Sequence, residues 1–156
     1  MTCKERLEKY LRENGVPFQS MTHPEVYTAQ EVAAAQHVPG KQLAKVVIAE
    51  ADGRMVMLVL PASYLVDFKK LQAFLGARKV RLAKEEEFSD IFPDCAIGAM
   101  PPFGNLYDIP VYVDRTLTEG SEIVFRAGTH RDTMKIRYAD FERLAKPEVG
   151  DFSVHI

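Results

Sequence analysis

The first forty residues carry two helix-start signals. Thr2 and Glu5 have the spacing of a capping box, the apolar residues that follow share one helical face, and Asn14-Gly15 supplies a stop. This pattern predicts a first helix between those signals. Residues 28–31 repeat the capping-box spacing ahead of an alanine-rich run that stops at Pro39-Gly40, which predicts a second, short helix.

The clearest strand signal lies next along the chain. Two runs rich in apolar and β-branched residues, 43–50 and 54–62, flank a turn that contains Asp52-Gly53. Asp-Gly between two such runs is typical of a tight β-hairpin. We therefore predict a hairpin with Lys45 at its entry.

Beyond the hairpin, the pattern alternates between short strands and short helices. Helices are expected over 68–75, 85–92 and 140–146. Strands are expected over 79–83, 109–114, 122–128 and 133–138. Asp67 is the expected cap of the first of these helices, and Asp140 is expected to open the last.

Strands that follow one another in hairpin-like steps, with helices inserted between them, do not imply a regular parallel βαβ sheet. A chain of 156 residues with 47% hydrophobic content is long enough for one sizeable core but short for two. We expect a single α+β domain over residues 1–156, with a mixed or mostly antiparallel, curved sheet.

The cysteine content and the N-terminal segment indicate the cellular compartment in which the protein is expected. Cys3 and Cys95 are far apart in sequence, lack metal-ligand spacing and are too few for the disulfide framework of small secreted proteins. The first residues are charged throughout, and no apolar run reaches the roughly 18 residues of a membrane span. A reducing cytoplasm is the simpler setting, and no membrane partner is expected.

The net charge of the chain bears on whether it binds nucleic acids. The net charge is −2 and the sequence pI is near 6.1, which argues against a generic polyanion binder. A tRNA partner therefore needs a local basic face, and its binding should be weak and salt-sensitive. The best local candidate is a cluster of five basic residues: Lys69, Lys70, Arg78, Lys79 and Arg81.

One loop is rich in residues that shape the backbone. Between residues 95 and 110, Gly98 and Gly104 surround the pair Pro101-Pro102. Proline fixes φ, and glycine permits geometries that a Cβ blocks, so such a loop can aim N–H groups at a carbonyl oxygen that becomes an oxyanion. An ordinary surface turn is the alternative interpretation.

Lys45 and two histidines are the candidate polar side chains. Lys45 has apolar flanks and can place a positive charge near a phosphate or an ester carbonyl, or it is simply a solvated strand-end lysine. His23, before Pro24, and His130, beside Asp132, are most simply turn residues. No serine or cysteine has a recognised nucleophile pattern, so a catalytic triad is not expected.

In combination, these pieces resemble the YbaK/EbsC family, which includes the inserted editing domain of bacterial prolyl-tRNA synthetases and several free-standing relatives. The similarity covers nearly the whole chain. Its landmarks, in order, are His23-Pro24, Thr28–Ala33, Lys45, Gly98–Pro102 and Ala127–Phe141. The order and spacing of these motifs make the combination fairly specific.

The resemblance implies a barrel-like sheet surrounded by helices, and a free-standing deacylase that hydrolyses the ester of mischarged aminoacyl-tRNA, often tRNA for proline. It implies no metal or cofactor. Lys45 would hold the terminal phosphate or the aminoacyl group, and the loop beginning Gly98-Ala99 would offer N–H groups to the carbonyl. Substrate contacts are expected at His23, Thr28, Met100, Pro101, Pro102, Gly128 and His130.

The implied partners are the acceptor end of a mischarged tRNA and, for some members, an aminoacyl-tRNA synthetase. Members that act on cysteinyl-tRNA look like Gly-Gly-x-Ser-Pro in the loop, whereas this chain has Gly98-Ala99-Met100-Pro101-Pro102. Cysteine specificity is therefore in doubt. Alanine, serine, threonine and non-protein amino acids remain open.

Two other function classes also remain open. The acidic pI and the missing general base suit a non-catalytic module that binds a nucleotide, an RNA end or a protein in the same cleft. The loop also suits a hydrolase of small-molecule esters or thioesters, because an oxyanion site serves any acyl transfer.

Overall fold

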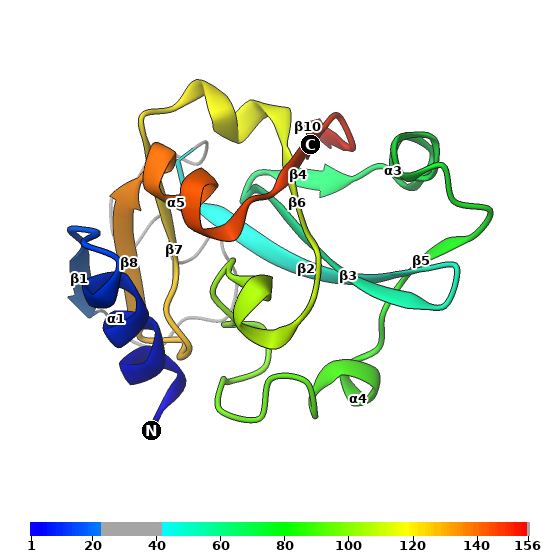
Figure 1. Ribbon diagram of the computed structural model, residues 1–156. Coiled ribbons are helices and arrows are strands. Elements are labelled where there is room, and N and C mark those ends of the chain that lie inside the picture. The colour runs from blue at the N-terminus through cyan, green and yellow to red at the C-terminus, as the bar shows by residue number, and fades with distance from the viewer. Residues whose placement is uncertain (23–41, 156) are drawn as a thin grey trace.

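The computed structural model describes residues 1–22 and 42–155, which form an α+β domain with three sheets (Figure 1). The largest sheet has the strand order β5-β2-β3-β6-β9. Its strands are β5 (Val80–Leu82), β2 (Ala44–Ala51), β3 (Arg54–Pro61), β6 (Val111–Asp114) and β9 (Glu148–Gly150). The β3–β6 and β6–β9 pairs are parallel, and the other pairs are antiparallel.

The predicted hairpin is confirmed as β2 and β3, with Lys45 near its entry. Its turn residues Asp52 and Gly53 have φ values of 49° and 85°. Positive φ at both central positions matches the twist of the flanking strands, which is why Asp-Gly is favoured there.

A second, antiparallel sheet has the order β1-β8-β7, with β1 (Gln19–Thr22), β8 (Asp132–Arg137) and β7 (Glu122–Arg126). A parallel bridge between Leu43 and Val124 links this sheet to the chain that enters β2. A third pair joins β4 (Tyr64–Val66) to β10 (Ser153–His155). The sheets therefore curl around the core without closing, and the predicted mixed, mostly antiparallel architecture is confirmed.

Helices cover the two ends of the curled sheet. The α-helices are α1 (Cys3–Glu13), α3 (Phe68–Leu75), α4 (Glu85–Phe88) and α5 (Tyr138–Ala145), and the 3-10 helices are η1 (Gly104–Tyr107) and η2 (Arg115–Glu119). Figure 1 shows α1 and α5 beside β7 and β8, and α3 at the other end. The predicted capping box of Thr2 and Glu5 and the predicted cap at Asp67 are both present.

Two helix boundaries differ from the predictions. The helix at Glu85 ends at Phe88, and the chain continues as tight turns that bury Phe92. The last helix begins at Tyr138 rather than at Asp140. Asp140 lies in the first turn, where its carboxylate pairs with Arg143 at 3.3 Å instead of capping the helix. The second predicted helix, with its start signal at Thr28, lies outside the described residues, and so does His23.

Two apolar clusters lie on the two faces of the β2–β3 hairpin. The first contains Phe103, Phe125 and Phe141 together with the buried face of α1. The second lies under α3 and contains Leu60 and Phe152. Because successive side chains of a strand point to opposite faces, each residue of β2 belongs to one of these two sides.

The fold brings the two cysteines together as a disulfide, although 92 residues separate them. The Cα atoms of Cys3 and Cys95 lie 5.1 Å apart, and the bond ties the start of α1 to the loop that precedes Gly98. This pairing was not expected from the sequence, because the two cysteines are far apart and too few for the disulfide framework of a small secreted protein. The hydroxyl of Tyr107 donates a hydrogen bond of 3.1 Å to Asp94 beside the disulfide.

Candidate active site

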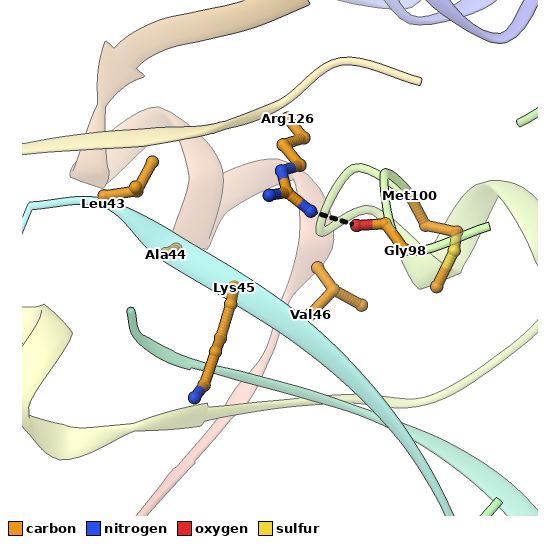
Figure 2. A pocket seen from close by; sticks show the side chains of 7 residues that line it. All are labelled: Leu43, Ala44, Lys45, Val46, Gly98, Met100 and Arg126. Atoms are coloured by element: carbon orange, nitrogen blue, oxygen red, sulfur yellow. Dashed lines mark hydrogen bonds between the residues drawn. The ribbon is translucent and has the colours of Figure 1, made fainter. Parts of the chain in front are cut away.

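A cleft of about 160 Å³ opens beside β2. Residues Leu43–Val46 form one wall, Gly98 and Met100 form the second, and Arg126 at the end of β7 lies between them (Figure 2). Among the described residues that line the cleft, none is a serine, cysteine, histidine or carboxylate. Over residues 1–22 and 42–155, the polar groups that border this cleft are therefore backbone groups and the two basic residues, Lys45 and Arg126.

Gly98 is the exposed tip of a loop whose following residues are buried. Its φ of +82° is in the left-handed region that favours glycine. The N–H of the next residue, Ala99, donates to the carbonyl of Ala96 at 3.0 Å and closes a turn. Within the part of the chain that the structure describes, no residue accepts a hydrogen bond from the N–H of Gly98. The N–H of Gly98 is therefore a candidate donor to a ligand.

Two side chains hold the carbonyl groups of this loop. Nη1 of Arg126 donates to the carbonyl of Gly98 at 2.8 Å (Figure 2). Nε2 of His130 lies 2.9 Å from the carbonyl of Ile97. A carbonyl oxygen only accepts hydrogen bonds, so Nε2 of His130 carries the proton in this contact.

Gly128 adds two backbone hydrogen bonds to the same loop. Its carbonyl accepts from the N–H of Ala96, and its N–H donates to the carbonyl of Ala99, both at 2.9 Å. Gly128 has φ of +95°, and a Cβ there would lie 2.7 Å from the Cβ of Cys3. Only glycine fits this close approach of the loop, the hairpin turn and α1.

Lys45 is half-buried, and burial lowers its pKa. In the hairpin register it lies opposite Leu60, a residue of the second apolar cluster. Residues directly opposite each other in a β pair share a face, so the Lys45 side chain leaves β2 on that side. Figure 2 shows it pointing away from Arg126 and Gly98, although its backbone contributes to the cleft wall.

Part of the predicted basic cluster is occupied by internal ion pairs. The guanidinium of Arg81 pairs with Glu50 and with Glu87. The hydrogen bonds with Glu87 raise the pKa of Arg81, and the same contact lowers the pKa of Glu87 to about 2. Lys70 pairs with Asp151 at 3.3 Å. These two cations are therefore less available to RNA phosphates than an unpaired basic patch would be.

The structure separates the predicted site residues into two groups. Three line the cleft: Lys45, Gly98 and Met100. Five lie in or behind the loop without lining the cleft: Ala99, Pro101, Pro102, Gly128 and His130. Sequence reasoning missed Arg126, whose one sequence signal is a charged residue directly after the apolar run 123–125.

Potential metal ligands gather at one place among the described residues: Cys3, Asp94 and Cys95. The disulfide uses both sulfur atoms, and a metal would need them as thiolates. Over the same described ranges, 1–22 and 42–155, each helix is too short or too polar to cross a bilayer.

Comparison with known proteins connects this geometry to a family. The sequence matches the family model of the aminoacyl-tRNA editing domain over residues 23–144. It is 28% identical over 153 residues to the multifunctional Ser/Thr-tRNA deacylase ProXp-y of Escherichia coli K12, covering 95% of this chain and 91% of that protein. It is 27% identical over 140 residues to proline-tRNA ligase of Staphylococcus saprophyticus, covering 87% of this chain but only 24% of the ligase.

The fold is also similar to those of solved structures. A crystal structure assigned provisionally to a trans-editing enzyme for prolyl-tRNA synthetase superposes with a TM-score of 0.84 at 22% identity, covering 99% of this chain and 98% of that one. The hypothetical protein APE2540 superposes with a TM-score of 0.85 at 20% identity over 95% of this chain and 99% of that one. With a family model that matches most of its length and a fold in agreement, the chain belongs to the aminoacyl-tRNA editing domain family.

Proposed function

We propose that this chain is a cytoplasmic trans-editing deacylase, which hydrolyses the ester between a wrongly attached amino acid and the 3′ end of a tRNA. The single observation that carries the proposal is the N–H of Gly98 at the wall of a cleft that two basic residues, Lys45 and Arg126, also line. Membership in the editing family supports the reaction class. The match to the deacylase ProXp-y covers 95% of this chain and 91% of that protein, which supports action on tRNA as a separate protein, in trans.

The proposed reaction needs no side-chain nucleophile. A water molecule attacks the ester carbonyl, and the carbonyl oxygen becomes an oxyanion that accepts a hydrogen bond from Gly98. Collapse of this intermediate breaks the bond to the ribose oxygen, which takes the proton that the water loses. An aminoacyl ester is already activated, so positioning and oxyanion stabilisation supply the rate increase.

The two cations have different proposed roles. The ammonium of Lys45 leaves β2 on the side away from Gly98, which suits a contact with the phosphate of the terminal nucleotide rather than with the ester carbonyl. Arg126 is bound to the carbonyl of Gly98 and lies inside the cleft. Since Ala99 already donates its N–H within the loop, we assign the oxyanion contact to the N–H of Gly98 rather than to that of Ala99.

The substrate class follows from the size and the walls of the cleft. A cavity of about 160 Å³ with apolar walls at Ala44, Val46 and Met100 suits a small aminoacyl group such as alanine, serine or threonine. We propose a tRNA of the proline type, because the relatives include proline-tRNA ligases that contain a matching segment. A prolyl-tRNA synthetase is the corresponding candidate partner.

A panel of mischarged tRNAs tests the proposal. Purified protein is mixed with tRNAs that carry alanine, serine, threonine or cysteine, and release of the amino acid is compared with buffer alone. We expect faster release of at least one small amino acid, and slower hydrolysis of the matching free aminoacyl ester. Saturable tRNA binding without turnover would indicate a binding module instead, and equal rates on free esters would indicate a small-molecule esterase.

A further inference from the structure

His130 and Arg126 contact two consecutive peptide groups of the Gly98 loop. Nε2 of His130 donates to the carbonyl of Ile97 at 2.9 Å. Nη1 of Arg126 donates to the carbonyl of Gly98 at 2.8 Å. These two carbonyls belong to the peptide groups on either side of the Gly98 Cα, so the two side chains act on both peptide planes that define its conformation.

The contact from His130 determines where the N–H of Gly98 points. That N–H and the carbonyl of Ile97 belong to one trans peptide group, in which the two bonds point in opposite directions. A hydrogen bond that holds the carbonyl toward His130 therefore directs the N–H away from His130. Gly98 lines the cleft, whereas His130 does not. The N–H of Gly98 therefore points away from the side of the loop on which the imidazole of His130 lies.

The contact from Arg126 fixes the following peptide group. The carbonyl of Gly98 shares this group with the N–H of Ala99, which donates to Ala96. This plane is therefore held at both of its ends. A glycine has little intrinsic preference for φ of +82° over other values, so the pinned planes, rather than a side chain of its own, keep Gly98 in this conformation.

Hydrogen bonding to the Ile97 carbonyl also polarises the peptide group. Hydrogen bonds that form a chain polarise one another, so a donor on this carbonyl makes the N–H of Gly98 a better donor. From these contacts we infer that His130 and Arg126 are positioning residues that aim the N–H of Gly98 at the reacting carbonyl. The inference rests on the proposed deacylase function. In it, His130 acts by holding the loop that contains Gly98, and not by contacting the substrate.

Paired variants separate this role from a purely structural one. His130→Leu removes the donor, and His130→Gln keeps an N–H at the end of a side chain of similar reach. In deacylation assays, His130→Leu should lower kcat by about 10- to 100-fold while KM changes by less than about twofold, because misplacement affects the chemical step. His130→Gln should recover much of the lost kcat.

Arg126→Met and Arg126→Lys test the second contact in the same way. Arg131→Met is the matched control, because Arg131 is an exposed arginine in the same hairpin turn, and it should leave kcat unchanged. Melting temperatures are measured for all variants. A kcat loss shared equally by His130→Leu and His130→Gln would overturn the inference, and so would a rise in KM at constant kcat.

A readout without substrate keeps this inference separable from the proposed function. In ¹⁵N-labelled protein, the Gly98 amide should shift and exchange faster with solvent in His130→Leu, and should stay close to wild type in His130→Gln and Arg131→Met. An unchanged Gly98 amide in His130→Leu would overturn the inference. If wild-type protein deacylates no tRNA, the proposed function fails, while the Gly98 amide still reports whether His130 holds the loop.

Discussion

The Gly98 loop and the Lys45 end of β2 border the same cleft, but they are positioned by different means. The loop is held by hydrogen bonds from Arg126, Gly128 and His130, so its donor direction is fixed by specific partners. The direction of Lys45 follows from strand alternation, which sends its ammonium to the opposite side of β2. We therefore expect these two landmarks, which the motif order groups together, to contact different parts of a substrate.

In the proposed reaction, this difference changes which basic residue lies beside the oxyanion. Arg126, not Lys45, is the charged side chain bound to the loop. A charge near the reacting carbonyl affects the chemical step, whereas a charge near a phosphate affects binding. Variants at the two ends should therefore differ in kcat and KM, and not merely in total activity.

The largest expected effect belongs to Gly98→Ala. We expect the deacylation rate to fall by about 100-fold. A Cβ makes φ of +82° unfavourable, so the N–H of residue 98 would no longer point at the reacting carbonyl. The space itself is not limiting, since the added Cβ would meet His130 at 3.5 Å, an ordinary contact. Rates are measured on the best substrate of the tRNA panel.

Gly53→Ala is the matched control for that variant. Gly53 has φ of +85° in the β2–β3 turn, and a Cβ there meets nothing within 4 Å. Both variants should lose about 1 kcal/mol of unfolding free energy from backbone strain, and only Gly98→Ala should lose activity. Equal activity in the two variants would remove Gly98 from the site.

Reduction of the Cys3–Cys95 disulfide should have the largest effect on stability. The bond closes a long segment of chain, so we expect a reductant to lower the free energy of unfolding by about 2–4 kcal/mol. Urea titrations with and without reductant measure this change, and a Cys3→Ala/Cys95→Ala double variant should not respond to reductant. Identical midpoints for the wild type in both conditions would show that the bond does not constrain the chain.

Deacylation at temperatures well below unfolding should fall less on reduction than in Gly98→Ala. The loop is also held by hydrogen bonds from segment 126–130, and we expect these bonds to remain when the disulfide opens. A loss on reduction as large as that of Gly98→Ala would mean that the covalent bond, and not the hydrogen bonds, sets the donor direction.

Lys45→Met tests the other end of the comparison. We expect KM to rise by about tenfold, or about 1.4 kcal/mol, with little change in kcat, because a phosphate contact binds substrate and transition state alike. The slope of log(kcat/KM) against log salt should also become shallower by about 0.7. Lys9→Met, on the exposed face of α1 and outside both the cleft and the basic cluster, is the control and should change neither value. A fall in kcat at constant KM would instead place Lys45 at the carbonyl.

The smallest expected effect concerns Tyr107, beside the disulfide. Burial, and then the charge of Asp94, raises the pKa of Tyr107 to about 12. An unfolded tyrosine ionises near its ordinary pKa of about 10, so stability should fall as pH rises from about 10 toward 12. Tyr107→Phe should make this fall shallower and should cost about 1 kcal/mol at neutral pH through the lost hydrogen bond to Asp94. An unchanged pH slope would contradict the assignment.

Local signals in the sequence predicted much of the fold. The caps at Thr2 and Asp67 and the turn at Asp52-Gly53 depend on residues a few positions apart, so their chemistry is readable along the chain. The short strands β1, β4, β9 and β10 were missed. A strand of three or four residues has too few positions for a periodic pattern, and its pairing partner defines it.

The site was predictable in part for the same reason. The loop at Gly98 is marked by its own glycine and prolines, but the contact that holds its carbonyl comes from Arg126, 28 residues away. Strand periodicity indicates that Lys45 and Val46 point to opposite sides, yet it does not say which side has the cleft. Only the packing of β7 and the loop against one face of β2 decides that.

The disulfide has a practical consequence for biochemical work on this protein. Because Cys3 and Cys95 are covalently joined, a single proteolytic cut between residues 4 and 94 leaves both fragments in one molecule. Such a nicked protein would run at full length on a denaturing gel without reductant and would separate into two bands only when thiol is added. Purity judged on non-reducing gels alone would therefore overlook cleaved material that still contains an assembled cleft.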